Sequence, residues 1–310
     1  MNIDKLKGLT LGLTATASWA SFYIVSRYFF GTDDSGLDPL WSSFLRYTIA
    51  ALVLILCAGT PRQLRTVGTA LRKDWKMLFL LGLIGIAGES TLLFYAMKFT
   101  TAARGNLLTN ISPVVTAVMA WFITRELFSR KQVAGMVLGS VGTAAIFFLR
   151  GGDNFAEGNV SFLLGDLLAV AAGVAWSAYT VLGARVVNEY GPRVTTALAF
   201  LSGAVVMIVV CLASGSRITL EISGRGWLLI LYLGLISSAL GNLCWYGALK
   251  YLKPGELGAF GYVSILLTFL LSICFLGEQV SLPFALCLMM ILLGTGMMLK
   301  GSSVKEDMKK

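Results

Sequence analysis

The fold is decided by two stretches of forty residues, AMKFTTAARGNLLTNISPVVTAVMAWFITRELFSRKQVAG (residues 96–135) and ALKYLKPGELGAFGYVSILLTFLLSICFLGEQVSLPFALC (residues 248–287). They align without a gap, and Lys98 matches Lys250, an offset of 152 residues. Further matched pairs are Ser112 and Ser264, Thr116 and Thr268, Glu126 and Glu278 and, at slightly different offsets, Trp19 and Trp176, and Pro39 and Pro192. The chain therefore contains an internal repeat.

The composition around this repeat indicates a membrane protein. Of the 310 residues, 56% are hydrophobic and only 13% are charged, with a mean hydropathy of +0.78, whereas a soluble domain carries about 25% charge. Ten apolar runs are each long enough to cross about 30 Å of hydrocarbon. They lie near 8–29, 38–58, 76–97, 103–123, 132–149, 162–184, 194–213, 227–249, 255–276 and 281–299. The sequence predicts an all-α integral membrane protein with ten transmembrane helices.

The repeat divides these helices into two sets of five. Residues 1–150 hold spans one to five, and residues 151–310 hold spans six to ten with a short cytoplasmic tail. Because five is odd, the second half enters the membrane from the opposite side, so the halves are predicted to be inverted repeats. Inverted repeats around a site near the midplane are a transporter design, in which one half rocks against the other and gives alternating access.

Lysine and arginine set the expected orientation. The net charge is +9, and the cations lie in short loops between apolar runs, so we expect no nucleic-acid partner. With the N-terminus inside, 18 of them fall on the inner side and 6 on the outer. Cytoplasmic loops carry this excess. Both termini are therefore predicted to be cytoplasmic.

Several function classes are disfavoured by residues that the chain lacks. There is no histidine, and the five cysteines show no CxxC spacing, so we expect no His-based triad and no metal site. The GxxxxGK[ST] motif of ATP-driven transport is also absent. We expect a protein that is not an enzyme and that needs no cofactor.

Particular motifs resemble the drug/metabolite transporter superfamily, specifically bacterial ten-helix EamA-type permeases. They are SW at 18–19, FLRYTIAAL at 44–52, the segment 100–146, AW at 175–176 and LGEQVS at 276–281. The resemblance covers nearly the whole chain and implies a multi-pass protein of the bacterial inner membrane that moves small metabolites. GES at 88–90, RGGDN at 150–154 and AWSAY at 175–179 are similar to aromatic amino-acid exporters. The family pattern is broken at Pro113, whose repeat partner is Ile265, and at Glu256, where small residues are usual.

Glu89, in IAGESTLLFYAM at 86–97, is the carboxylate that needs explanation. A charge at the bilayer centre costs about 2.5–3.5 kcal/mol, so it faces a cavity or a partner. At 1.5 Å per residue, Glu89 lies roughly 21 Å from the inner side and Arg46 about 10 Å from the outer side, which are matching depths. Either the two form a buried ion pair that fixes neighbouring helices, or Glu89 binds an ammonium group or a proton. The repeat aligns Gly241 with Glu89, so the second half lacks the pair of charges that Arg46 and Glu89 make in the first half.

Four helices carry polar and aromatic stripes at spacings of three and four, which place the side chains on one face. Such groups avoid lipid, and together they predict a central wet cavity. The candidate substrate-binding residues are Glu89, Trp19, Phe22, Tyr23, Asn106, Asn110, Trp176, Tyr179, Asn242, Trp245 and Tyr246. Arg46 and Pro113 are structural or gating candidates, Pro113 because a proline in mid-helix frees the carbonyl of Thr109.

Other residues are predicted to have structural roles. Glycines at 82–88, 135–142 and 255–261 permit close helix contact. Glu126 and Glu278 lie at span ends as cap or interface residues. Trp41, Trp75 and Trp227, also at span ends, are expected to be interfacial anchors.

The leading functional hypothesis is a secondary transporter that exports amino acids with aromatic or apolar side chains. Efflux of hydrophobic cations through the same aromatic faces is the alternative, and a membrane-embedded enzyme is disfavoured. The expected partners are a small-molecule substrate, the lipid bilayer and, if Glu89 titrates, protons. Both a monomer and a homodimer fit the sequence.

Overall fold

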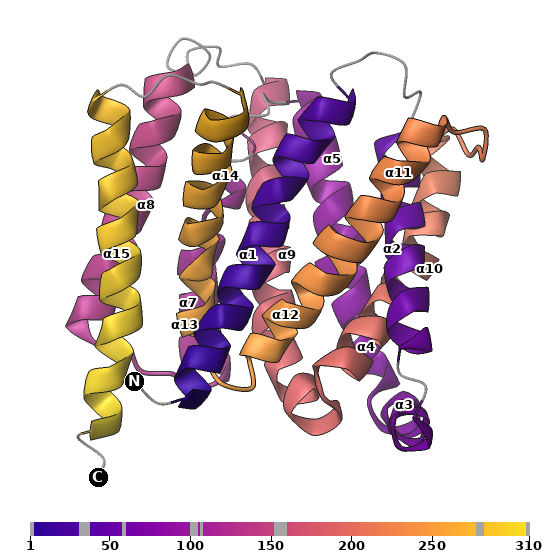
Figure 1. Cartoon of the computed structure of the whole chain (residues 1–310), viewed down its shortest axis with the longest axis horizontal. Helices are drawn as coiled ribbons and strands as arrows, with labels where there is room; N and C mark the ends of the chain where they lie inside the picture. The colour runs from indigo at the N-terminus through magenta and orange to yellow at the C-terminus, as the bar shows by residue number, and fades with distance from the viewer. Residues whose placement is uncertain are drawn as a thin grey trace.

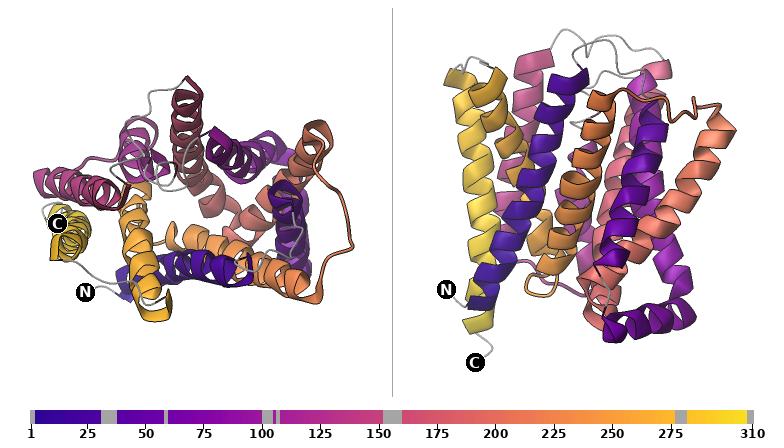
Figure 2. Two further views of the ribbon diagram at one scale, coloured as in Figure 1. Left: turned by 90° about the horizontal axis from the view of Figure 1, so that it is seen from above. Right: turned by 45° about the vertical axis from the view of Figure 1, so that its right-hand side comes forward.

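The computed structural model describes residues 3–30, 38–57, 60–99, 105, 108–151, 160–276 and 282–307, and all regular structure in these ranges is helical. Most helices run side by side as a bundle, and α3 lies across its lower end (Figure 1, Figure 2). In chain order the elements are α1 (Ile3–Phe30), α2 (Pro39–Leu56), α3 (Pro61–Lys73), α4 (Trp75–Leu81), η1 (Gly82–Gly88), α5 (Glu89–Phe99), α7 (Ser112–Ile123), α8 (Arg130–Gly151), α9 (Val160–Tyr190), α10 (Pro192–Ser214), α11 (Gly224–Tyr232), η3 (Leu233–Leu240), α12 (Gly241–Ala248), α13 (Pro254–Gly258), α14 (Phe260–Leu276) and α15 (Leu282–Asp307).

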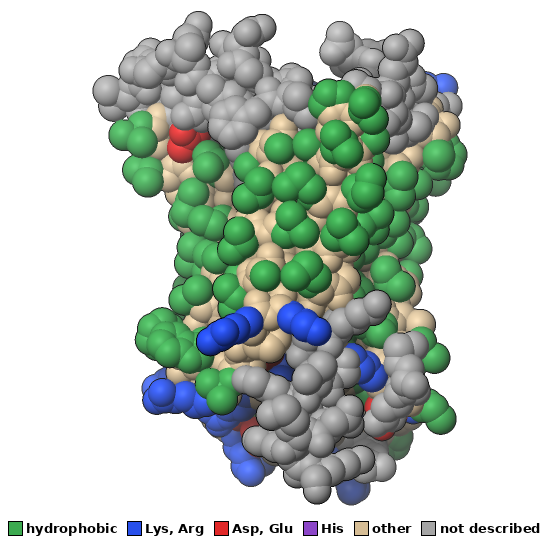
Figure 3. Space-filling model, turned by 90° about the vertical axis from the view of Figure 1, so that its left-hand side faces the viewer, with side chains coloured by type: hydrophobic (Ala, Val, Ile, Leu, Met, Phe, Trp, Pro, Cys, Tyr) green, Lys and Arg blue, Asp and Glu red, His purple; other side chains and the backbone are tan. Residues whose placement is uncertain are grey.

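The lengths and apolar surfaces of these helices fit a membrane. Within the described ranges, six helices are long and apolar enough to cross one: Pro39–Leu56, Trp75–Phe99, Leu163–Tyr190, Pro192–Ser214, Gly224–Ala248 and Pro254–Leu271. Two shorter apolar helices, Ser112–Ile123 and Ala285–Leu299, lie within the runs predicted at 103–123 and 281–299. Figure 3 shows apolar side chains across the middle of one face, with Lys and Arg gathered at its lower end. Within the described ranges the protein is therefore all-helical, with six helices that can cross a membrane.

Local sequence determines where several helices start and stop. Asp38 caps α2, because its carboxylate accepts hydrogen bonds from the backbone N–H groups of Leu40 and Trp41, and Pro39 occupies the first turn, where no N–H is needed. Gly191, at a φ of 83°, precedes the start of α10 at Pro192, and Gly215, at a φ of 69°, ends that helix in the left-handed conformation.

Small residues set the closest helix contacts. α8 packs along α15, at the opposite edge of the bundle from α10 and α11 (Figure 1, Figure 2). A Cβ placed on Gly135 would lie 2.5 Å from the carbonyl oxygen of Gly294, so only glycine permits this approach. Gly82 is as close to the backbone of α10, and Gly258 packs on Thr116. Close contact was predicted for these glycine groups and is confirmed.

Two long continuous helices each contain a π-helical segment. η1 joins α4 to α5, and η3 joins α11 to α12. At their ends the N–H of Glu89 donates to the carbonyl of Ile84, and the N–H of Gly241 donates to that of Ile236, five residues back in each case. η1 packs on α10 and η3 packs on α2. Such segments are rare and frequently mark functional sites.

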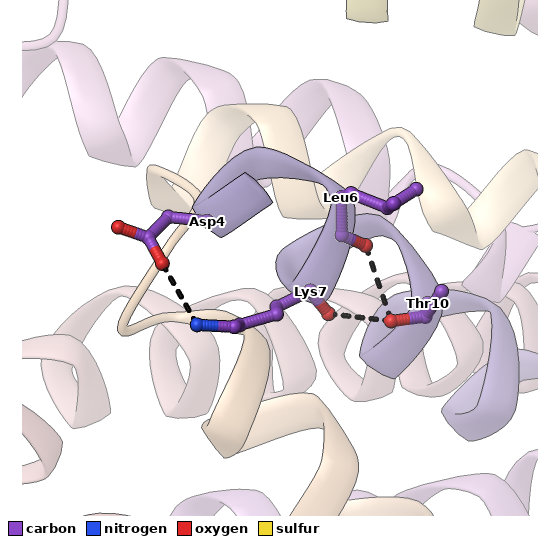
Figure 4. Close-up of polar contacts among 4 residues, drawn as sticks. All are labelled: Asp4, Leu6, Lys7 and Thr10. Carbon is purple, nitrogen blue, oxygen red and sulfur yellow. Dashed lines mark hydrogen bonds and ion pairs between the residues drawn. The ribbon is translucent and has the colours of Figure 1, made fainter. Parts of the chain in front are cut away.

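Both described ends of the chain lie at the lower end of the bundle (Figure 1). There Lys7 Nζ lies 3.1 Å from Oδ1 of Asp4, and the hydroxyl of Thr10 donates to the carbonyls of Leu6 and Lys7 (Figure 4). The hydrogen bond to the Asp4 carboxylate raises the pKa of Lys7. The first turn of α1 is therefore a charged end that precedes its apolar length.

The tryptophans at span ends differ from one another. The side chain of Trp75 is 53% exposed, as expected of an interfacial anchor. Trp41 is only 5% exposed, and its indole N–H donates to the carbonyl of Thr219, 2.7 Å away. The prediction of a lipid-facing anchor is therefore wrong for Trp41, because its ring packs inside the protein and holds the segment that follows α10.

Candidate functional site

Three tryptophans from distant parts of the chain meet at the centre of the bundle. Trp19 on α1, Trp176 on α9 and Trp245 on α12 have ring centroids 5.1, 5.1 and 5.7 Å apart pairwise. Tyr179 lies 5.4 Å from Trp176 and stacks on Tyr246 at 4.5 Å. We call these five residues the aromatic cluster. Its convergence follows from the spacings on each helix. Tyr179 is three residues after Trp176, and Trp245 and Tyr246 are three and four residues after Asn242, so each set lies on one side of its helix.

Hydrogen bonds hold the rings of the cluster in place. The indole N–H of Trp19 donates to the carbonyl of Ser237, and that of Trp245 donates to the hydroxyl of Thr180, both at 3.0 Å. The hydroxyl of Tyr246 donates to the carbonyl of Tyr179, also at 3.0 Å. Buried indole and phenol groups need such partners, so the orientations of these three rings are fixed, one on α1 and two on α12.

Polar atoms without a protein partner lie on the same helices. Among the described residues, the Tyr179 hydroxyl, Ser238 Oγ and Asn242 Oδ1 are buried and accept or donate no hydrogen bond. The side-chain amide of Asn242 donates to the carbonyl of Ser238 at 3.1 Å, which leaves its oxygen free. A buried polar group without a partner costs free energy and calls for an explanation. Here it leaves one acceptor and two hydroxyls for a ligand.

The predicted charges Arg46 and Glu89 are connected through two hydroxyls. The Arg46 guanidinium donates to the Tyr47 hydroxyl, which shares a hydrogen bond with the Ser90 hydroxyl. Ser90 in turn donates to Oε2 of Glu89 at 3.2 Å. We call these four residues the hydroxyl relay. Within the described ranges the guanidinium and the carboxylate form no direct ion pair, so the link between α2 and α5 is indirect.

The relay adjoins the aromatic cluster. The Arg46 guanidinium lies 5.6 Å from the ring centroid of Phe22 and 4.4 Å from that of Tyr47, which are cation–π distances. Phe22 is one turn from Trp19 on α1. On the other side, Gly85 of η1 lies directly against the Tyr179 ring. The structure therefore places charged, hydroxyl and aromatic groups side by side, on α1, α2, α5, α9 and α12.

Not all predicted site residues join this group. Tyr23 lies on α1 but its side chain, like the whole of Asn106, is outside the described residues. Asn110 is half-buried in the turn that precedes α7. The prediction for these three residues stays a prediction.

Pro113 is not in mid-helix, so the predicted mid-helix position is wrong. α7 begins at Ser112, and Pro113 lies in its first turn, where a missing N–H leaves no gap. The residues directly before α7 and at its start pack against α9. The hydroxyl of Ser177 donates to the carbonyl of Ser112 at 3.0 Å, and Gly173 lies against the carbonyl of Thr109. Pro113 thus sets where α7 starts against α9.

Glu126 has an interface role, as predicted, and lies apart from the cluster. Its side chain is 6% exposed, and Oε2 accepts a hydrogen bond from the backbone N–H of Gly255 at 3.0 Å. This bond ties the segment between α7 and α8 to α13. Burial raises the pKa of Glu126 to about 7, helped by Glu256 and opposed by the Gly255 bond and Lys253. Its repeat partner Glu278 lies outside the described residues.

Tyr47 and Ser90 are the site residues that the sequence prediction missed. Each directly follows a predicted charge, in RYT and GES. Hydroxyl side chains next to a membrane-buried charge were the available signal, because such charges need hydrogen-bond partners.

Comparison with known proteins shows the family of the chain. A model of the EamA-like transporter family matches residues 6–148 and again residues 163–300. The chain belongs to the EamA-like transporter family. This confirms the resemblance, and the family is one of transporters rather than enzymes.

Individual relatives are more distant. The chain is 27% identical to the uncharacterized transporter YyaM of Bacillus subtilis over 80% of this chain and 79% of that one. It is 27% identical to the aromatic amino acid exporter YddG of Ancylobacter novellus (84% and 86%) and 26% identical to a probable terminal-alkyne amino-acid exporter of Streptantibioticus cattleyicolor (84% and 82%). A crystal structure of a protein with 22% identity superimposes with a TM-score of 0.80, covering 96% of this chain and 98% of the other, which shows the shared fold.

Proposed function

We propose that this EamA-family transporter exports amino acids with aromatic or apolar side chains from the cytoplasm across the bacterial inner membrane. The proposal rests on the proximity of the hydroxyl relay to the aromatic cluster: the Arg46 guanidinium lies 5.6 Å from the ring centroid of Phe22, which is one turn from Trp19 on α1. A molecule with an apolar ring at one end and an ammonium and a carboxylate at the other requires this combination of surfaces.

Each part of the substrate has a matching group. The faces of Trp19 and Trp176, both half-buried, stack on the side chain. The Glu89 carboxylate and Oδ1 of Asn242 accept from the ammonium group, and the Ser238 hydroxyl donates to the carboxylate. The tryptophans pack on one another in this structure, so substrate enters by parting the rings of α1 and α9.

We propose that export proceeds by alternating access between two inverted five-helix halves, residues 1–150 and 151–310, with ten spans in all. Three observations support this part of the proposal. The family model matches twice, once in each half. The segments η1 and η3 occupy matching positions at the 152-residue offset. η1 packs on α10 as η3 packs on α2, which is the exchange of partners that inversion requires.

The cytoplasmic location of both termini is part of the same proposal. It is supported by the gathering of Lys and Arg at the lower end of the molecule, where both described chain ends lie (Figure 1, Figure 3). The amino-acid substrate class is supported by the names of two relatives, the aromatic amino acid exporter of Ancylobacter novellus and the probable terminal-alkyne amino-acid exporter of Streptantibioticus cattleyicolor.

Counterflow in proteoliposomes tests the substrate class. Vesicles loaded with unlabelled phenylalanine, tryptophan, leucine, lysine or aspartate are diluted into the labelled form of the same amino acid. We expect counterflow for the first three only. Trp176→Ala removes a half-buried face of the cluster and should lower phenylalanine counterflow at least tenfold, whereas Trp121→Ala, a matched change on the outer surface of α7, should leave it unchanged.

Two results would overturn the proposal. One is counterflow of hydrophobic cations with none of any amino acid, which is the outcome expected of a drug efflux protein. The other is phenylalanine counterflow that is equally sensitive to Trp121→Ala and Trp176→Ala, because the aromatic cluster would then have no special part in transport.

A further inference from the structure

α3 lies across the lower end of the bundle (Figure 2), and it carries exposed apolar side chains as well as buried ones. Ala70 is fully buried and Val67 half-buried against the bundle. Leu64 and Leu71, two turns apart on the adjoining side of the helix, are 54% and 46% exposed. A helix with water on all its outer sides gains nothing from such leucines, whereas a helix that lies in a membrane interface buries them among acyl chains.

The remaining side of α3 is basic. Arg65, Arg72 and Lys73 are all exposed, and α4 adds Lys76, whose ammonium lies 5.8 Å from the ring centroid of the exposed Trp75. Tryptophan at this position is typical of the headgroup level. The leucines and the cations Arg65, Arg72 and Lys73 therefore follow one another around α3, and Trp75 and Lys76 lie at the start of α4 directly after it.

The acidic groups nearby leave this positive charge in excess. Asp74 is engaged, because it accepts a hydrogen bond from the Tyr190 hydroxyl at 2.6 Å and pairs with Arg185 at 3.5 Å. Glu189 faces Arg65 across a pocket of about 560 Å³. Within the described ranges, Arg72 and Lys73, at the far end of α3, form no ion pair with a carboxylate.

We propose that α3 is a docking surface for anionic phospholipids in the membrane leaflet at the end of the bundle where both termini lie. Leu64 and Leu71 insert among the acyl chains, and Arg72 and Lys73 bind the lipid phosphates. Asp74, which directly follows α3, is fixed to α9 through Tyr190, so the docked helix is attached to the long helix that carries Trp176 and Tyr179.

The test titrates the full-length protein in a neutral detergent with phosphatidylglycerol or phosphatidylcholine and follows the thermal unfolding midpoint. Each cation near an anionic lipid surface contributes about a fivefold gain in affinity. We therefore expect Arg72→Gln/Lys73→Gln to weaken the phosphatidylglycerol-specific response about 30-fold at low salt. Arg130→Gln/Lys131→Gln, a matched exposed pair at the start of α8, should keep the native response, and Arg72→Lys should keep most of it.

Two further measurements separate the contributions of the charges and of the leucines. Salt at about 0.5 M should reduce the native response to that of Arg72→Gln/Lys73→Gln, because screening weakens exposed charges. Leu64→Gln/Leu71→Gln should lower the response while all cations remain. The proposal is overturned if Arg72→Gln/Lys73→Gln responds like the native protein, if the α8 pair loses as much, or if soluble glycerol phosphate gives the same midpoint shift as the lipid.

Discussion

Glu126→Gln gives the most quantitative prediction, because one buried carboxylate connects two distant segments. Its oxygen accepts from the N–H of Gly255, and Lys253 and Glu256 are the charged groups that act on it in opposite directions. Glutamine keeps a carbonyl oxygen for the N–H of Gly255 and removes the charge. The substitution therefore isolates the free-energy cost of ionising residue 126 in the folded protein.

The size and sign of this cost follow from the pKa. A pKa of about 7, against the ordinary 4.5, corresponds to on the order of 3 kcal/mol at 1.36 kcal/mol per pKa unit. The folded protein holds the proton more tightly than the unfolded chain does, so ionisation of Glu126 lowers the free energy of unfolding as pH rises from about 4.5 to 7. Above pH 7 the full cost is present, and below pH 4.5 it is absent.

Thermal unfolding in detergent at pH 5 and pH 8 measures this difference. We expect Glu126→Gln to raise the unfolding midpoint above that of the native protein at pH 8, by a few degrees, and to match it more nearly at pH 5. Glu126→Ala, which leaves the N–H of Gly255 without its acceptor, should instead lower the stability by about 1–3 kcal/mol at pH 5, whereas at pH 8 the removal of the charge offsets this loss. If the native protein and Glu126→Gln differ equally at the two pH values, the reasoning is refuted.

Three further substitutions are predicted to act elsewhere. A methyl group at Gly241 would lie 2.7 Å from Nε1 of Trp19, so Gly241→Ala should destabilise by about 1–3 kcal/mol in denaturant titration, whereas Gly224→Ala, at an open position, should be neutral. Tyr190→Phe removes the donor to Asp74 and should cost about 1.5–3 kcal/mol in the same assay; an unchanged midpoint would show that this bond adds nothing. Glu89→Gln should raise the KM for phenylalanine at least tenfold in proteoliposomes, and an unchanged KM would exclude contact with the ammonium group.

Much of the helix arrangement is predictable from the sequence, because membrane thickness fixes span length. The run predicted at 76–97 corresponds to Trp75–Phe99, and the run at 227–249 corresponds to Gly224–Ala248. The convergence of Trp19, Trp176 and Trp245 is also foreseeable, because polar-edged rings on several helices avoid lipid and meet inside. Helical spacing and the apolar surroundings of the membrane are sufficient to predict these features.

Other features depend on contacts between helices, which spacing along one helix does not determine. Pro113 fits a kinked span as well as a helix start, and only the contacts of the neighbouring residues with α9, and of Pro113 with Gly258 of α13, decide between them. The hydroxyls of Tyr47 and Ser90 come between Arg46 and Glu89 because α2 and α5 meet at one particular rotation. The π-helical turns of η1 and η3 change the rotation of all that follows, and no residue type in GLIGIAG or LGLISSAL specifies them.

The asymmetry between Glu89 and Gly241 follows from the packing of Trp19. Each residue begins an α-helix directly after a π-helical segment, at matching positions of the repeat. At Gly241 the indole of Trp19 occupies the space that a side chain would need, and the same indole contacts Trp176 and Trp245. A carboxylate at position 241 would therefore displace the Trp19 ring from the aromatic cluster. Under the proposed function, the first half of the repeat carries the charged residue Glu89, and the matching position of the second half, Gly241, makes room for the ring of Trp19. A substrate that is zwitterionic at one end and aromatic at the other therefore binds in a single orientation.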